Sequence, residues 1–98
     1  MATTQVRVYR IRPGALEEFE REWRENVVPL RRRFGFEVVG AWASDDGEAF
    51  VWVIRHEGDF AAADRAYYLS PERAALDPDP ARHISDPRAF LVRPVELP

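Results

Sequence analysis

Residues 36–56 read FEVVGAWASDDGEAFVWVIRH, and this stretch predicts two antiparallel strands joined by a tight turn. The turn is Asp45-Asp46-Gly47-Glu48, in which Gly47 suits a backbone position with positive φ. The stretches on either side, Phe36 to Ser44 and Ala49 to His56, are rich in the β-branched and aromatic side chains that strands favour. The sequence therefore predicts a β-hairpin here.

Both faces of this hairpin are apolar. Successive side chains of a strand point to opposite faces. The first strand has Phe36, Val38 and Trp42 in one set and Val39, Ala41 and Ala43 in the other, while the second has Phe50, Trp52 and Ile54 against Val51 and Val53. Leaving one of these faces in water would forgo several kcal/mol, at about 25 cal/mol per Å² of apolar surface. We therefore expect a homodimer, in which a second copy covers the free face about a two-fold axis and closes a barrel-like core.

An amphipathic helix precedes the hairpin. Its apolar stripe follows helical spacing through Leu16, Phe19, Trp23, Val27, Leu30 and Phe34. Acidic residues crowd the first turn and Arg31-Arg32-Arg33 the last, so we interpret these arginines as a solvated helix end. Pro29 removes a backbone hydrogen bond, and it predicts a kink or break near Glu25–Asn26.

The remaining segments complete an alternating pattern. We expect a strand at Gln5 to Arg12, a helix at Phe60 to Leu69, a short helix at Pro71 to Leu76, irregular chain at Leu76-Asp77-Pro78-Asp79-Pro80, and a last strand at Arg88 to Val95. The order is β-α-β-β-α-β, which predicts an α+β, ferredoxin-like fold in a single domain over residues 1–98. Right-handed crossovers would place both helices on one face of a four-stranded antiparallel sheet.

The composition excludes several classes of function. The 98 residues carry a formal net charge of −3, which argues against a nucleic-acid-binding surface. No apolar run approaches the ~20 residues that span a bilayer, so we expect no membrane partner. The chain has no cysteine, which fits a cytoplasmic location and excludes thiolate chemistry. All 14 basic residues are arginine, so lysine-based catalysis is excluded.

Several short segments follow one another in a distinctive order. They are Val6-Arg7-Val8-Tyr9-Arg10-Ile11-Arg12-Pro13-Gly14, Leu16-Glu17-Glu18-Phe19, Trp23-Arg24-Glu25, Val28-Pro29-Leu30, Gly35-Phe36, Val39-Gly40-Ala41-Trp42 and Trp52-Val53-Ile54-Arg55-His56, followed by Arg65. This order, over roughly residues 5–76, resembles that of NIPSNAP-family domains, although the family pattern often has Tyr where this chain has His56. The resemblance implies membership of the dimeric α/β-barrel superfamily, which agrees with the fold and the homodimer expected above.

The resemblance leaves three functions open. Many NIPSNAP-like bacterial domains have no assigned activity, which favours a small homodimeric domain that binds a hydrophobic or aromatic ligand or a protein partner. More distant relatives in the superfamily include cofactor-independent monooxygenases, lactone isomerases, dehydratases and haem-degrading enzymes. They imply, as an alternative, an enzyme of monooxygenase or isomerase type that acts on an aromatic or polyketide-like substrate. A purely structural or interaction module is the third possibility.

The candidate site is a pocket between the helices and the sheet. We expect Tyr9, Trp23, Asn26, Trp42, Trp52, His56 and Tyr67 to line it, with Arg7 and Arg55 as further ligand contacts. Trp and Tyr side chains offer flat apolar walls with a polar handle, which suits an aromatic ligand.

Three of these residues are candidates for catalysis: His56, Tyr9 and Asn26. His56 would act as a general base near neutral pH, and Asn26 or an arginine would stabilise a developing enolate. Each candidate also has a structural interpretation. The tryptophans suit a core or a dimer interface, Arg7 and Arg55 suit ion pairs with nearby acids, and His56 suits a structural hydrogen bond at the end of a strand.

No metal or cofactor is expected. The two histidines, His56 and His83, fall on separate elements without the spacing of metal ligands. A histidine alone is weak evidence for haem, and the sequence has no glycine-rich phosphate loop.

Overall fold

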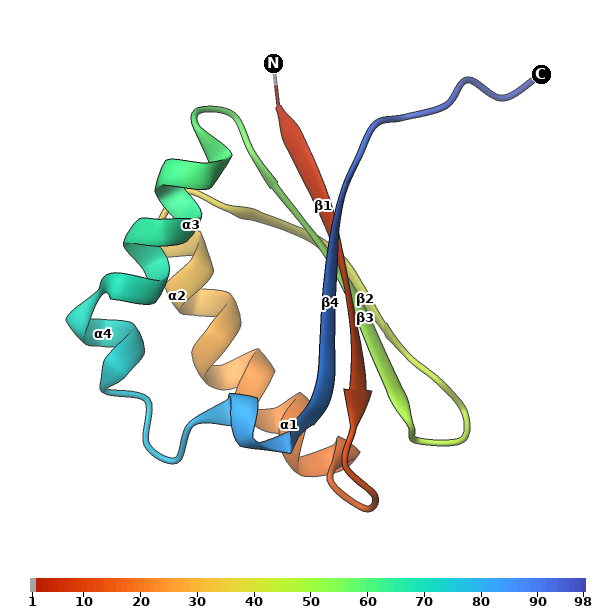
Figure 1. Ribbon diagram of the computed structural model, residues 1–98, viewed down its shortest axis with the longest axis vertical. Coiled ribbons are helices and arrows are strands. Elements are labelled where there is room, and N and C mark those ends of the chain that lie inside the picture. The colour runs from red at the N-terminus through yellow and green to blue at the C-terminus, as the bar shows by residue number, and fades with distance from the viewer. Residues whose placement is uncertain (1) are drawn as a thin grey trace.

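Strands and helices alternate along the chain in the order that the sequence predicts. A computed structural model describes residues 2–98. The elements are β1 (Thr3–Ile11), α1 (Leu16–Glu22), a π-helical turn η1 (Trp23–Val27), α2 (Val28–Arg33), β2 (Glu37–Ala43), β3 (Ala49–His56), α3 (Phe60–Leu69), α4 (Pro71–Ala74), a 3₁₀ helix η2 (Pro80–His83) and β4 (Ile84–Val92). The strands form one antiparallel sheet in the order β2-β3-β1-β4, and the helices all lie on one side of it, as Figure 1 shows. This is the ferredoxin-like arrangement.

The predicted hairpin is confirmed as β2 and β3. Gly47 in its turn has a φ of 77°, a backbone conformation in which glycine carries no steric cost. The side chain of Asp46 closes the turn, because it accepts hydrogen bonds from the Ser44 hydroxyl at 2.6 Å and from the Glu48 amide at 2.9 Å. Glu37 pairs with Arg55 at the far end of the hairpin, and a register shift follows Val38.

The first helical segment is interrupted at the position that Pro29 predicts. The amide of Val28 donates to the carbonyl of Trp23, five residues earlier, which defines a π-helical turn. Pro29 has no amide hydrogen, and it sits in the first turn of α2, where a missing donor costs little. The segment therefore changes its helical phase between α1 and α2, while the chain continues in the same direction.

The last strand differs from its predicted position at Arg88 to Val95. It begins earlier, at Ile84, and ends at Val92. Pro87 lies inside it, opposite Tyr9 of β1. A proline fits there because β4 is an edge strand. The backbone nitrogen of Pro87 has no hydrogen to donate, and at the free edge of the sheet no neighbouring strand needs that donor. Before β4, residues 76–79 are irregular as predicted, and Pro80 opens a 3₁₀ helix, Pro80–His83, whose N-cap Asp79 accepts from the Ala81 amide.

The core lies between the helices and the inner face of the sheet. It is mostly aromatic, with Tyr9, Ile11, Phe19, Val27, Phe36, Phe50, Trp52, Ile54 and Phe60 packed as one cluster. Its rings meet edge to face: the centroids of Phe19 and Phe50 are 5.1 Å apart, and those of Trp23 and Trp52 are 5.6 Å apart. This inner layer positions the site described below.

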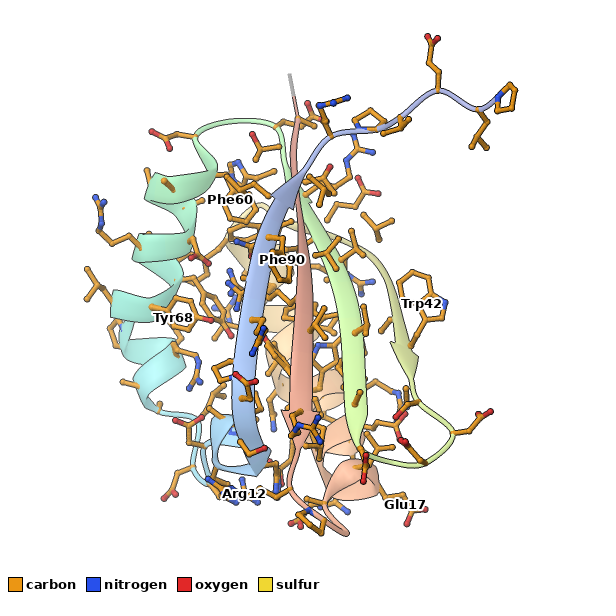
Figure 2. The ribbon with its side chains drawn as sticks, turned by 45° about the vertical axis from the view of Figure 1, so that its right-hand side comes forward. Arg12, Glu17, Trp42, Phe60, Tyr68 and Phe90 are labelled. Carbon is orange, nitrogen blue, oxygen red and sulfur yellow. The ribbon has the colours of Figure 1, made fainter. Side chains whose placement is uncertain are left out.

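The outer face of the sheet is also apolar, as the sequence predicts. The outer patch consists of six residues that are cross-strand neighbours, namely Val6, Val8, Trp42, Val51, Val53 and Phe90. The valines are half-buried, whereas Trp42 is 58% exposed and Phe90 is 52% exposed. Figure 2 shows these two aromatic side chains on the edge strands β2 and β4. No helix in residues 2–98 covers this face.

Gly40 leaves room for the Trp42 ring on the outer patch. A Cβ atom at Gly40 would lie 3.0 Å from Cη2 of the Trp42 ring, which is tighter than most real Cβ contacts. The ring therefore lies along its own strand in the space that the glycine leaves.

Among the described residues, none of the helices combines the length and the apolar character needed to cross a membrane.

Candidate functional site

A cavity of about 240 Å³ lies between the sheet and the helices. Its lining comes from most of the elements and consists of Arg7, Tyr9, Phe19, Trp23, Val27, Arg31, Trp52, Tyr67, Tyr68, Arg73, Pro80, Ala81, Ile84 and Pro87. The inner face of the sheet, α3 and η1 thus each supply a wall, and η2 lies at one end. This is the pocket that the sequence predicts between helices and sheet, with a lining that is partly different.

Aromatic rings form much of the wall. Trp52 is 1% exposed, and its ring is perpendicular to that of Trp23. Tyr9 and Tyr67 are also buried, and the rings of Tyr9 and Trp52 are 6.5 Å apart. Tyr9 and Trp52 share the inner face because Trp52 pairs with Arg7, two residues from Tyr9 on β1. The structure therefore brings together four of the predicted aromatic residues.

Arg7 is the polar centre of the cavity. Its side chain is buried, and its guanidinium donates to the phenol oxygens of Tyr68 at 2.8 Å and Tyr9 at 3.3 Å. It also donates to Gln5 at 2.8 Å and to Asp64 at 3.3 Å. The predicted ion pair of Arg7 with an acid is therefore present, and Arg7 lines the pocket as well.

Arg31 is buried, so its interpretation as part of a solvated helix end is wrong. It is 1% exposed, its guanidinium lies 3.8 Å from the centroid of the Tyr67 ring, and it donates to Asp64 at 2.8 Å. The reason is the π turn. A π turn contains one residue more than an α-helical turn, so Arg31 turns inward as well as the expected Leu30, which is 5% exposed. Arg32 and Arg33 stay exposed, as predicted.

Two further residues of the site escaped the sequence analysis. Asp64 accepts from both Arg7 and Arg31 on the same oxygen, Oδ1. The hydroxyl of Tyr68 also accepts from both arginines, at 2.8 and 3.3 Å. Asp64 and Tyr68 are four residues apart on α3 and so share one face of that helix. This spacing of four residues can be read from the sequence. It indicates a shared binding face only once the two buried arginines are known to lie opposite it.

The ionisation states in the cavity are set by these contacts. Burial alone would lower the pKa of Arg7, but the oxygens of Tyr9 and Tyr68 raise that pKa above its ordinary value, so the guanidinium stays charged. Burial raises the pKa of Tyr67 against the opposing effect of Arg31, so this phenol stays neutral at pH 7. The site thus presents a charged guanidinium at Arg7 and a neutral phenol at Tyr67.

Within residues 2–98, three buried nitrogen atoms of the site have no hydrogen-bond partner. They are Nε1 of Trp23, Nε of Arg31 and Nε1 of Trp52, and all three belong to residues that line the cavity. Each of them is an N–H donor. An unpaired buried donor is costly, and buried polar groups in folded proteins are rarely left without a partner.

The structure places four predicted site residues elsewhere. Trp42 is on the outer patch, and Asn26 is exposed on the π turn beside Pro29. Arg55 lies near Glu37 and Glu57, with nitrogen–oxygen distances of 3.8 and 3.9 Å. The prediction that Trp42 and Asn26 line the same cavity as Tyr9 is therefore wrong. Strict alternation places Trp42 on the same face as Val38, but the register shift after Val38 turns Trp42 to the outer face. Asn26 lies on the exposed side of the π turn.

His56 also lies away from the cavity. It stands at the end of β3, and its Nδ1 accepts a hydrogen bond from the Gly58 amide at 2.9 Å. Its ring packs on Phe36 at 5.0 Å and fills the space beside Gly35, where a Cβ would lie 3.0 Å from Nε2. These contacts match the structural interpretation of His56, and its predicted place in the pocket with Tyr9 is wrong.

A second cluster of titratable groups joins α1 to η2. Glu18, Glu22 and His83 bring one ligand atom each within 4.8 Å of one another, a proximity that the spacing of these residues in the sequence does not indicate. Arg82 already occupies both carboxylate oxygens of Glu22, at 2.8 and 2.7 Å. These hydrogen bonds lower the pKa of Glu22, with a further contribution from His83. The cluster is therefore an ion-pair network in which arginine supplies the cation.

Comparison with known proteins supports one family. The family model of NIPSNAP matches residues 4–97 of the chain. No curated protein matches it. Among solved structures, a NIPSNAP family protein from Agrobacterium tumefaciens has a TM-score of 0.85 and 18% identity, over 98% of this chain and 95% of that one. A second Agrobacterium tumefaciens protein of the family, described as having unknown function, has a TM-score of 0.86 and 17% identity, over 99% and 91%.

The fold is also shared outside the family. A putative antibiotic biosynthesis monooxygenase from Bacteroides thetaiotaomicron has a TM-score of 0.75 and 15% identity, over 97% of this chain and 90% of that one. At these identities the likeness concerns the fold, and the chemistry has to be argued from the side chains of the cavity.

Proposed function

Since the chain belongs to the NIPSNAP family, and its relatives share the fold without fixing a reaction, we propose that it is a small homodimeric domain that binds an aromatic or hydrophobic small molecule. The observation that carries the proposal is the aromatic cavity between the sheet and α3. Trp23, Trp52 and Tyr67 give it flat apolar walls, and a few convergent polar groups fix orientation, which is the usual composition of a ligand pocket.

The cavity has an accessible side. Tyr68 is 47% exposed although its hydroxyl meets Arg7, so the ring spans from the cavity to the surface. Ala81 on η2 also lines the cavity and is exposed. A flat molecule would enter along this side and stack against the buried rings, while the NIPSNAP fold keeps the sheet rigid beneath it.

The test uses a neutral aromatic probe, 2-naphthalenemethanol, followed by the indole N–H signals in a proton–nitrogen NMR spectrum. We expect the signals of Trp23 and Trp52 to shift and that of Trp42, on the outer patch, to stay. An Ala81→Trp substitution fills the accessible side and should weaken binding at least tenfold. Ala61→Trp is the matched control, because Ala61 is exposed on α3 and does not line the cavity. Unchanged indole signals at saturating probe would refute the proposal.

The second part of the proposal is the homodimer. The outer patch is an apolar face of cross-strand neighbours, and a second copy of the chain is the occupant that matches it by symmetry. The helix-side cavity and the outer patch are on opposite faces of the sheet. Dimerisation would therefore leave the cavity accessible, and it would stiffen the strands that carry Arg7 and Trp52.

The alternative is an enzyme of monooxygenase or isomerase type. The cationic donors of the cavity favour this alternative, because they would stabilise an enolate or a phenolate. In that case Tyr9 and Arg7 are the polar groups near a substrate, since His56 and Asn26 lie elsewhere. Oxygen uptake with 1,4-dihydroxynaphthalene, above the rate without protein, would favour the alternative. An oxygen-uptake rate equal to that without protein would contradict the alternative and leave ligand binding as the proposed function.

A further inference from the structure

The cavity is charged as well as aromatic. Of the residues that line it within the described chain, three are arginines, namely Arg7, Arg31 and Arg73, and none is acidic. This is unusual in a chain whose net charge is −3. Positive charge is therefore concentrated in the cavity although the molecule as a whole is acidic.

The internal counter-charge is insufficient. Arg73 is paired with Asp79 at 2.9 Å, which leaves Arg7 and Arg31. These two buried guanidiniums share one carboxylate, and both contact the same oxygen of Asp64. Asp64 itself is 27% exposed, so part of its charge is solvated. The cavity thus holds an excess of one positive charge in apolar surroundings, where an unpaired charge is costly.

The unsatisfied hydrogen-bonding groups have the same polarity. The three buried nitrogen atoms without a partner, on Trp23, Trp52 and Arg31, are all donors. Arg31 and Trp52 are each 1% exposed, so bulk water is not their partner. What the cavity lacks is an acceptor, and an anionic oxygen is the strongest acceptor available.

From the charge excess and the missing acceptors, we propose that the ligand of this site is an aromatic anion. Its carboxylate or phenolate oxygen offsets the excess charge beside Arg7 and accepts from the donors that lack a partner, while its ring packs among Trp23, Trp52 and Tyr67. This inference rests on the proposed function, because it specifies the ligand of the same cavity. A small inorganic anion fits less well, because it would supply the charge but leave the aromatic walls without a partner.

The experiment compares probes that share one ring system. Calorimetry would measure 2-naphthoate against the neutral 2-naphthalenemethanol, with acetate and inorganic phosphate as anions that have no ring. We expect 2-naphthoate to bind at least tenfold more tightly than the alcohol, and both ringless anions to bind more weakly than 2-naphthoate. In the NMR spectrum the carboxylate should move the indole N–H signals of Trp23 and Trp52 downfield, as acceptors do, while that of Trp42 stays.

Each outcome separates the two proposals. Equal affinity for acid and alcohol overturns the anion inference and leaves the proposed function standing. Binding of neither naphthalene removes both proposals. Phosphate or acetate binding as tightly as 2-naphthoate overturns the inference as well, because the ring would then contribute nothing.

A charge variant tests the role of Arg7. Arg7→Gln should bring the affinity for 2-naphthoate down to that for the alcohol. Arg10→Gln is the control, because Arg10 is an exposed arginine on the same strand, outside the cavity. Asp64→Asn gives an independent reading, since loss of the internal carboxylate should widen the preference for the acid severalfold. The proposed placement of the anion beside Arg7 is contradicted if Arg7→Gln still prefers 2-naphthoate to the alcohol. It is also contradicted if Asp64→Asn shows a smaller preference for 2-naphthoate than the unmodified chain. The comparison of probes on the unmodified chain stands even if a variant fails to fold.

Discussion

At the scale of single residues, Arg31 shows how a charged side chain becomes part of a core. Its guanidinium is sandwiched by rings, with centroids at 3.8 Å for Tyr67 and 4.8 Å for Phe36. Such cation–π contacts favour arginine over lysine, because the planar guanidinium stacks on an aromatic face. Asp64 pairs with this guanidinium and with that of Arg7, so one carboxylate serves two buried cations. The cavity and the core therefore share the same ionic contacts.

Loss of Arg31 should be costly for this reason. We expect Arg31→Ala to lower the free energy of unfolding by about 3 kcal/mol or more, because it removes a buried ion-pair partner and leaves a void among rings. Urea unfolding followed by circular dichroism would measure the change. Arg32→Ala, at the exposed neighbour, should stay within about 0.5 kcal/mol of the unmodified chain. Similar stabilities for the two variants would contradict the burial of Arg31.

At the scale of elements, local sequence patterns predicted the hairpin and the helices that those patterns directly specify. The β2–β3 hairpin was predictable from alternation and from the Asp46-Gly47 turn, and α3 from its Asp59 cap, which accepts from the Ala62 amide at 3.0 Å. The start of β4 was not, because a proline stops a strand by rule and only the edge position of β4 tolerates Pro87.

The candidate site was predictable only in part, for a related reason. Side chains on the inner face of the sheet, such as Tyr9 and Trp52, follow from strand alternation. The pairing of Arg31 with Asp64 does not, because it depends on a change of helical phase that the sequence marks only through Pro29. Asn26 was assigned to the pocket with a kink expected beside it, but the direction of its side chain could not be predicted, and it lies on the exposed side of that turn.

The π turn makes a prediction of its own. Phe19, Trp23, Val27 and Arg31 follow at intervals of four, so the turn carries one residue more than an α-helix needs. Deletion of Asn26 should restore α-helical spacing and keep these side chains inward, at a cost of about 1 kcal/mol or less. Deletion of Glu20, in α1, rotates Phe19 relative to Trp23 and should unfold the chain. Thermal unfolding would compare the two variants, and equal loss of structure in both would show that the turn is more than an added residue.

At the scale of the whole molecule, the two faces of the sheet have different surroundings. Its inner face holds the aromatic core and the cavity, and its outer face carries the outer patch without cover from the chain's own helices in residues 2–98. The C-terminal segment after β4 leads away from the body of the molecule, as Figure 1 shows, and Val95 and Leu97 in it are exposed. The tail therefore does not screen the patch, which supports the proposal that a second copy of the chain covers it.

A charge at the centre of the outer patch should separate the proposed dimer. Val53 lies on β3, beside Val6 of β1, in the middle of the sheet. We expect light scattering after size exclusion to give twice the chain mass of 11.3 kDa for the unmodified protein at micromolar concentration, and the single-chain mass for Val53→Glu. The carboxylates of the two copies would be buried against each other without partners, which costs more than such an interface returns. Val53→Thr keeps the β-branched shape without the charge and should remain dimeric. If the unmodified chain is monomeric at that concentration, the outer patch has another occupant and the homodimer is wrong.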